Sequence, residues 1–468
     1  MVGLDSRIVI IGLPQVASQL RADAEQAIWI TQSYVLANTI MLLLIGRLGD
    51  IFGRVKIYTI GFAFFTIGSG LTSLGTNATE VIIFRAFQGI GAALVFTNSI
   101  AIITDSSPRQ QLGFFLGINQ IAFRAGAMLG LTVSGLILSF LDWRALFYIN
   151  IPIGIFGTFW ANRSLKETAY LDKNRKIDWV GFLAFTGFLL SLMIALTFGA
   201  YGLEDARTVY ALFASAAVFL ILFIIQERRI DYPIVDLKLF RIRAVTGGVL
   251  ALLFNIMSWT AVLLLLSLQF QLVRNESPLE AGIRILPFEL AFLAVGPLSG
   301  RLADKFRPAP FIMTGLTLNT ISLFLFSTTN QTTPYTVLSL YMILLGVGTG
   351  LFVAPNLRAL LSAVPMQRRG IGSALFSLFL NIGLTLSLNV AIFIMSLTMP
   401  YNLITQIISS VNPTAISTAD RILFVTSLQN TYIALGIINA MAIAPSFLQI
   451  SRKTKTNQEK TSIPQAEG

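Results

Sequence analysis

Six ionisable side chains stand within stretches of sequence that are otherwise apolar, and four of them are candidates for a chemical role. Asp5, Arg85 and Arg124 lie in the first third of the chain, and Glu289 is the only carboxylate deep in an apolar run of the second half. An ionisable residue inside a membrane helix costs at least about 2.5 kcal/mol on insertion scales, so each needs a specific role. The chain has no histidine. Proton exchange would therefore use carboxylates, with arginine as a fixed charge that favours their ionised form.

Arg85 and Glu289 each have two interpretations. Arg85 begins an uncharged run and either holds its charge beside a carboxylate or extends toward the outer surface near Glu80. Glu289 either carries a proton or binds a cation, or it makes a structural hydrogen bond to another helix. Arg284 lies about 140° around the helix from Glu289, at about 100° per residue, so we expect no ion pair between them.

The composition places these residues in lipid. Of the 468 residues, 55% are hydrophobic and 12% are charged, against about 25% charged in a soluble globular protein. A span needs roughly 20 apolar residues, and backbone groups in lipid must bond within their own segment, so long apolar runs are helices. The clearest uncharged runs are Ala27–Gly46, Ile57–Thr79, Ala86–Thr104, Val180–Leu203 and Thr208–Gln226.

All such runs together predict an all-α membrane protein with 14 transmembrane helices. Thirteen are full spans, and the first, Met1–Leu20, is abbreviated. We expect either that its true start lies upstream or that this helix lacks its first turns.

The residue types exclude several kinds of chemistry. Without cysteine there is no disulfide, thiolate metal site or cysteine nucleophile. The glycine-rich segment GRLGDIFGR at 46–54 lacks the spacing of a phosphate-binding loop and the strand that precedes one. We expect no metal, no cofactor and no enzymatic activity.

The net charge of +11 is unevenly distributed. Of the 33 lysines and arginines, 24 fall on one set of alternate loops and the C-terminal tail, and 5 fall on the opposite set. Excess positive charge on short loops marks the cytoplasmic side. The charge therefore indicates orientation rather than a nucleic-acid partner, and the C-terminus is expected in the cytoplasm.

The segment at 46–54 is echoed by GRLADKFRP at 300–308. Both follow the second helix of a six-helix block, provided that two intervening helices are set aside as an insertion. Parallel six-helix repeats with a binding site between them are a known transporter plan. The predicted units are a first bundle at 1–164, two inserted helices at 178–228, a second bundle at 244–450 and a disordered cytoplasmic tail at 451–468.

The first copy of this segment resembles the signature between helices 2 and 3 of the major facilitator superfamily, G-x-L-a-D-r-x-G-r-k. The matching residues are Gly46, Leu48, Asp50, Gly53, Arg54 and Lys56. The resemblance implies two six-helix bundles with a gating loop, formed by Gly46, Asp50, Gly53 and Arg54 with Asp304 of the second copy. A basic turn that only orients the chain is the alternative.

Further segments resemble the same family. RAFQGIGAAL at 85–94 is similar to its helix 4 signature, and LDSRIVIIGLP at 4–14 is similar to its helix 1 signature, with Arg7 in place of a threonine. DWRALFYINIPIG at 142–154 and SPLEAGIRILPFELAF at 277–292 resemble segments of the fourteen-helix drug–proton antiporter branch.

The antiporter pattern of helix 5 in that branch is met at four glycines. They are Gly117, Gly126, Gly130 and Gly135. Leu131 stands where the pattern has proline, and Ser134 where it has a glycine. Small residues four apart let helices pack backbone to backbone.

The resemblance implies a transporter that exports amphipathic, drug-like molecules across the cytoplasmic membrane in exchange for protons, by alternating access. Its partners would be a small-molecule substrate, protons and the lipid bilayer, and we expect a monomer. Asp5, Arg85, Glu289 and Arg124 are the candidate proton-coupling and substrate residues. Four arginines lie within the helices (Arg7, Arg85, Arg124 and Arg284) against the two carboxylates Asp5 and Glu289. This surplus makes an organic-anion exporter, or an importer of the same fold, the alternative. A membrane receptor or scaffold that transports nothing is a third hypothesis.

Overall fold

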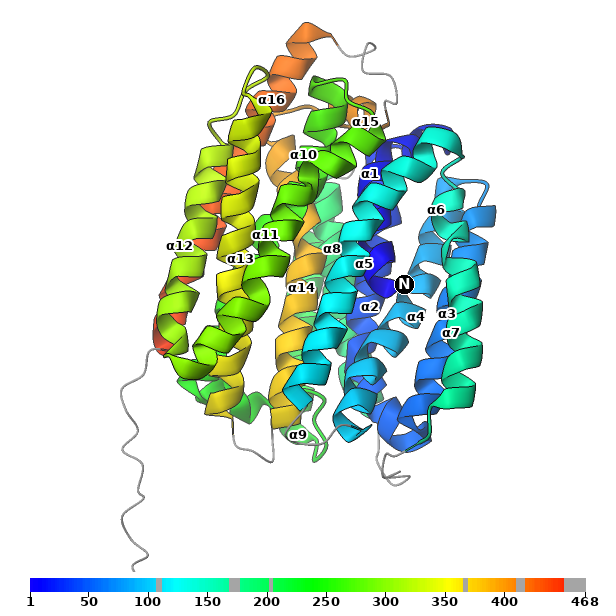
Figure 1. The fold of residues 1–468 in the computed structure, drawn as a ribbon, viewed down its shortest axis with the longest axis vertical. Coiled ribbons are helices and arrows are strands. Elements are labelled where there is room, and N and C mark those ends of the chain that lie inside the picture. Colours follow the sequence, from blue (N-terminus) through cyan, green and yellow to red (C-terminus); the bar gives the residue numbers. More distant parts are fainter. Residues whose placement is uncertain (107–111, 168–176, 202–204, 365–368, 410–416, 450–468) are drawn as a thin grey trace, which may run out of the picture.

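The computed structural model describes residues 1–468 except for 107–111, 168–176, 202–204, 365–368, 410–416 and 450–468. The described residues form long helices that run roughly side by side, joined by short turns (Figure 1). The prediction of an all-α chain is confirmed.

The first third of the chain begins part-way along the bundle, where Figure 1 marks the N-terminus. Its helices are α1 (Val2–Gln19), α2 (Ala24–Phe52), α3 (Arg54–Leu74), α4 (Ala78–Ser106), α5 (Leu112–Phe140), α6 (Ala145–Tyr148) and α7 (Asn150–Ser164).

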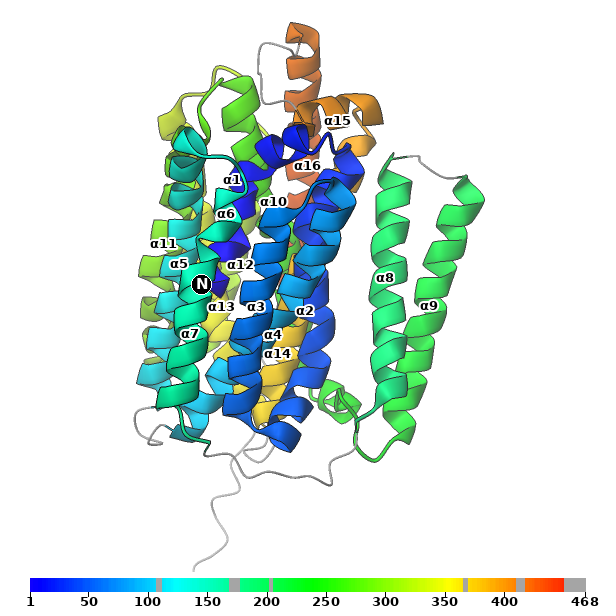
Figure 2. The same cartoon turned by 90° about the vertical axis from the view of Figure 1, so that its right-hand side faces the viewer.

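Two helices follow that stand to one side of the others (Figure 2). They are α8 (Trp179–Tyr201) and α9 (Ala206–Arg229), which pack against each other. The α8 helix also contacts α2 and α14, and in the latter contact the Thr197 hydroxyl donates to Asn389 Oδ1 at 3.3 Å.

The remaining helices form the other side of the bundle in Figure 1. They are η1 (Leu237–Arg241), α10 (Arg243–Leu268), η2 (Gln269–Val273), α11 (Pro278–Lys305), α12 (Pro308–Phe326), α13 (Tyr335–Ala363), α14 (Arg369–Ser396), α15 (Tyr401–Ser409), α16 (Thr418–Met441), α17 (Ile443–Ser446) and η5 (Phe447–Gln449).

Within the described residues, 12 helices are long and apolar enough to cross a membrane, so the chain is a multi-pass membrane protein. The sequence predicted 14, and the two that fall short are α1 and the α6–α7 segment. The α1 helix has 18 residues, a length of about 27 Å, and carries Asp5 and Arg7. The α7 helix has 15 residues and follows a single turn, α6.

Two helix starts that flank the functional residues carry capping boxes. The Asp23 carboxylate accepts from the Gln26 backbone N–H at 2.7 Å. The Gln26 side-chain oxygen in turn accepts from the Asp23 backbone N–H. Ser277 and Glu280 make the same reciprocal pair ahead of α11, with Pro278 at its first position. Such pairs satisfy N–H groups that have no partner within the helix.

Glycines set how closely α4 approaches its neighbours. A methyl group added at Gly68 of α3 would lie 2.7 Å from Gln88 Cα, and one at Gly89 of α4 would meet the Tyr34 carbonyl of α2. At both positions the neighbouring backbone is too close for any side chain larger than hydrogen. The α4 helix is thereby held against α2 and α3, which fixes the position of Arg85 between them.

The predicted antiporter glycines lie on α5. Gly126 and Gly130 face the backbone of α1 near Leu4, and Gly135 faces Leu279 of α11. On the same α5–α11 contact, Leu131 presents its carbonyl oxygen to Gly282, where an added methyl would lie 2.6 Å away. The α5 helix therefore joins α1 to α11. Gly117 lies near the start of α5.

We predict that Gly130→Ala destabilises the protein by about 1–3 kcal/mol, the usual effect of overpacking. The new methyl would run into the Leu4 carbonyl oxygen and lie 3.3 Å from Arg7 Cβ. Thermal unfolding in detergent, followed by tryptophan fluorescence, measures the shift. Gly70→Ala is the matched control, because its methyl would have one ordinary neighbour, Ile151 Cδ1 at 3.8 Å. Equal unfolding midpoints for the two variants would contradict the prediction.

Candidate functional site

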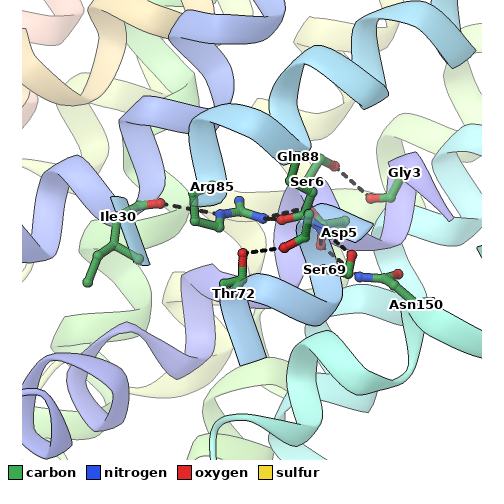
Figure 3. A network of polar contacts seen from close by, with 10 residues as sticks. Gly3, Asp5, Ser6, Ile30, Ser69, Thr72, Arg85, Gln88 and Asn150 are labelled. Carbon is green, nitrogen blue, oxygen red and sulfur yellow. Dashed lines mark hydrogen bonds and ion pairs between the residues drawn. The ribbon is translucent and has the colours of Figure 1, made fainter. Parts of the chain in front are cut away.

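Asp5 and Arg85 form a buried salt bridge (Figure 3). Arg85 Nη1 lies 2.7 Å from Asp5 Oδ2, and the two residues are 1% and 0% exposed. Gln88 Nε2 and Asn150 Nδ2 donate to Asp5 Oδ1 at 3.0 and 2.9 Å. Both carboxylate oxygens therefore have donors, supplied by α4 and α7 to a side chain on α1.

The Arg85 guanidinium is enclosed on its other sides. Its Nε donates to the Ile30 carbonyl at 3.3 Å, and its Nη1 also donates to Gln88 Oε1 at 2.6 Å. Its Cζ lies 4.3 Å from the centre of the Tyr34 ring and 5.5 Å from that of Phe147. Charge and hydrogen bonding are thus satisfied inside the bundle, as a buried ion pair requires.

The interpretation in which Arg85 extends toward Glu80 is wrong. Glu80 is occupied at the start of α4, where it accepts from the Thr76 backbone N–H at 2.9 Å. The network around Arg85 instead continues inward, because Gln88 Nε2 donates to Ser69 Oγ of α3 at 2.6 Å.

A second cluster of charges lies between α1, α5 and α11. Arg7 Nε lies 3.7 Å from Glu289 Oε1, and the two residues are 8% and 2% exposed. Arg124 Cζ lies 3.9 Å from the centre of the Phe292 ring, and its charge interacts with those of Glu289 and Arg7. Arg7 also lies over the Trp259 ring, at 5.9 Å.

Arg284 does not pair with Glu289, as its position on the helix predicted. Its Nε lies 2.7 Å from Glu276 Oε2, in the segment that joins η2 to α11. Burial raises the pKa of Glu276, while the charges of Arg284 and Arg274 oppose that shift.

The predicted gating loop is largely helical. Gly46 and Asp50 lie in the last turns of α2, and the turn itself is the single residue Gly53, at φ +99°. That conformation favours glycine. The turn is therefore tight, because α3 begins at Arg54 directly after it.

Ion pairs and a hydrogen bond connect this turn to neighbouring segments. Arg54 pairs with Asp50 at 3.2 Å and with Asp105 of α4. Glu167 Oε2 accepts from the Val55 backbone N–H at 2.9 Å, at the start of α3. Asp304 lies in the last turn of α11.

The four candidate residues thus divide between two clusters, Asp5 with Arg85 and Glu289 with Arg124. Sequence reasoning did not single out Gln88 or Asn150 as partners of Asp5. Both stand in segments that resemble the family, RAFQGIGAAL and DWRALFYINIPIG, so the signal was present. Arg7 appeared only as a departure from a signature, and nothing local to it indicates Glu289.

Comparison with known proteins identifies the family. The profile described as Major Facilitator Superfamily matches residues 1–388 and 248–462. The chain belongs to the major facilitator superfamily.

Several transporters of the superfamily are similar in sequence over most of their length. The riboflavin transporter RibZ of Clostridioides difficile (strain 630) is 29% identical, with 82% of this chain and 83% of that protein covered. The tetracenomycin C resistance and export protein of Streptomyces glaucescens is 27% identical, with 82% and 71% covered. The multidrug resistance protein Stp of Mycobacterium tuberculosis (strain CDC 1551 / Oshkosh) is 29% identical, with 82% and 72% covered.

Solved structures share the superfamily fold. A bacterial homologue of the human lysosomal transporter Spinster, inward-facing and unoccupied, aligns with a TM-score of 0.65 at 16% identity, covering 96% of this chain and 94% of that one. The xylose transporter XylE from E. coli, inward open, aligns with a TM-score of 0.62 at 15% identity, covering 97% and 94%. Identities this low support the fold alone.

We predict that Arg85→Gln destabilises this superfamily member by about 3–5 kcal/mol, because it leaves the Asp5 carboxylate buried without its counter-charge. The double variant Asp5→Asn with Arg85→Gln should recover much of the loss. Thermal unfolding in detergent provides the comparison. Arg144→Gln is the control, because the exposed pair of Arg144 and Asp142 should contribute at most about 1 kcal/mol. An Arg85→Gln variant with the same unfolding midpoint as the Arg144→Gln control would contradict the prediction.

Proposed function

We propose that this chain exports amphipathic small molecules in exchange for protons. The observation that carries the proposal is the buried Asp5–Arg85 pair, a carboxylate and a fixed positive charge inside a superfamily transporter. Relatives named as a tetracenomycin C resistance and export protein and as a multidrug resistance protein support the direction and the kind of substrate.

The proposed arrangement has 14 crossings in the cytoplasmic membrane. The α1 helix and the α6–α7 segment complete the set begun by the 12 long apolar helices. Residues 1–164 and 244–450 form the two bundles, 178–228 the inserted pair, and the tail lies in the cytoplasm. The protein acts as a monomer and catalyses no covalent chemistry.

In the proposed mechanism Asp5 exchanges the coupled proton. A proton on Asp5 would remove the ion pair and leave Arg85 with Gln88, the Ile30 carbonyl and the Tyr34 ring. Because the donors to Asp5 come from α4 and α7, its charge state controls how α1 is held against them.

A shift of α1 would reach the other side of the bundle through close backbone contacts. The α1 helix packs on α5 at Gly126 and Gly130, and α5 packs on α11 at Gly135. The protonated and ionised forms would then favour opposite openings of the two bundles, which is alternating access expressed as a population shift.

The second candidate keeps the fold but changes the substrate or direction, to an organic-anion exporter or an importer. Arg7 and Arg124 face a single carboxylate, Glu289, between α1, α5 and α11. A relative named as a riboflavin transporter also widens the range of substrates in the superfamily.

Proton flux in proteoliposomes tests the leading proposal, once a dye-efflux screen in a host lacking its own pumps has supplied a substrate. The wild type should show substrate-dependent proton movement in the opposite direction. Asp5→Asn should reduce it at least about tenfold while substrate exchange persists, since asparagine takes up no proton.

Asp142→Asn is the matched control, because Asp142 is exposed and pairs only with Arg144 among the ion pairs of the described residues. Unchanged proton flux in Asp5→Asn would contradict the role of Asp5, and unchanged flux in Glu289→Gln as well would remove the coupling assignment altogether. Accumulation of the substrate inside cells would contradict export and favour the importer instead.

A further inference from the structure

The second charge cluster carries an inference of its own, which rests on the proposed transport function. We propose that Arg7, Arg124 and Glu289, with the rings of Trp259 and Phe292, form a binding site for a planar aromatic molecule that bears an anionic group. We call these five residues the arginine–aromatic site.

The charges of the site do not balance. Two guanidiniums face one carboxylate, which gives a net charge of +1 when Glu289 is ionised. The nearest other acid on α1, Asp5, already accepts from Arg85, Gln88 and Asn150. An excess positive charge in a partly enclosed site attracts an anion, so the site favours a second one.

The hydrogen-bonding capacity of the site is also unused. Within the described part of the chain, neither Arg7 nor Arg124 donates a hydrogen bond, although a guanidinium has five N–H donors. Trp259 Nε1 and Glu289 Oε1 are buried without a hydrogen-bond partner, in side chains that are each 2% exposed. Carboxylate, sulfonate or phosphate oxygens would accept from the guanidiniums and the indole N–H.

The rings supply a surface for an aromatic body. The Trp259 and Phe292 ring centres are 6.3 Å apart and nearly perpendicular, and Phe288 lies 5.1 Å from Trp259. Arg124 already lies over Phe292, which shows how a guanidinium and a ring combine here. Arginine binds planar anions and aromatic faces at once, unlike lysine.

The site draws its residues from both sides of the bundle. Arg7 and Arg124 lie on α1 and α5, whereas Trp259 lies on α10, and Glu289 and Phe292 lie on α11. A ligand held by all of them would contact both sides at once, as a transported substrate must in alternating access.

Glu289 has a particular role in this proposal. Its carboxylate occupies the position beside Arg7 that a ligand anion would take, at 3.7 Å. It therefore competes with the ligand for the guanidiniums and sets how strongly the site selects an anion. Neutralising Glu289 should strengthen anion binding, whereas a cation-binding role for Glu289 requires the opposite.

Binding of two dyes of similar shape tests the proposal on purified protein in detergent, without a proton gradient. Fluorescein is the anionic probe and rhodamine 6G the cationic one, and fluorescence anisotropy reports binding. Wild type should prefer fluorescein. Arg124→Gln and Arg7→Gln should each weaken fluorescein binding at least about tenfold, and Glu289→Gln should strengthen it several-fold.

Two further variants keep the test decisive if a glutamine variant unfolds. Arg124→Lys retains the positive charge but loses the planar guanidinium with its paired N–H donors. It should weaken fluorescein binding by less than Arg124→Gln does. Arg144→Gln is the matched control, since Arg144 lies over Trp143 at 4.7 Å but is more than a third exposed, and should bind both dyes as the wild type does.

Preference for rhodamine 6G, or fluorescein binding unchanged in both the Arg124 and Arg7 variants, would overturn the proposal. So would loss of fluorescein binding in Glu289→Gln. These outcomes leave proton flux through Asp5 untouched, so failure of the anion site and failure of proton-coupled export are separately visible.

Discussion

The salt bridge between Asp5 and Arg85 is the interaction on which the first third of the chain depends. Neither group could be buried alone, because removing one partner of such a pair leaves a charge that the surroundings cannot compensate. The pair is surrounded by Gln88 on α4, Asn150 on α7 and the Tyr34 ring on α2. Four helices thus meet at one carboxylate and one guanidinium, and their relative positions are set by these bonds.

The two buried charge clusters differ in how fully they are compensated. Around Asp5 each carboxylate oxygen has a donor, whereas Glu289 has one long ion pair and an oxygen without a hydrogen bond. A satisfied polar network rigidifies the helices that contribute to it. The first cluster is therefore built into the helices of one side, and the second, between the sides, is the one prepared for an additional ligand.

Much of the fold could be predicted from the sequence. Apolar runs marked the long helices because lipid forces each backbone group to bond within its own segment. The count of 14 was matched at 12 helices of the described residues, because α1 carries charged residues that lower its mean hydropathy and α7 has only 15 residues after the single turn α6. The tight turn at Gly53 follows from a glycine that can adopt a positive φ, while the α2 helix continues through Gly46 and Gly49.

The site was predictable only in part, for a physical reason. Asp5 and Arg85 were conspicuous because charge in an apolar run is rare. Their partners Gln88 and Asn150 are uncharged, and a polar amide is not conspicuous in the same way. The Arg7–Glu289 pair joins residues 282 positions apart, and no local pattern reports so distant a contact.

The position of α8 has a mechanical consequence. It contacts α2 on one side of the bundle and α14 on the other, with the Thr197–Asn389 hydrogen bond buried on the second contact. A helix that bridges two moving bodies cannot remain fixed to both. If the bundles rock as proposed, the α8–α9 pair must move with one of them and exchange its contacts with the other, including the Thr197–Asn389 hydrogen bond if it moves with α2.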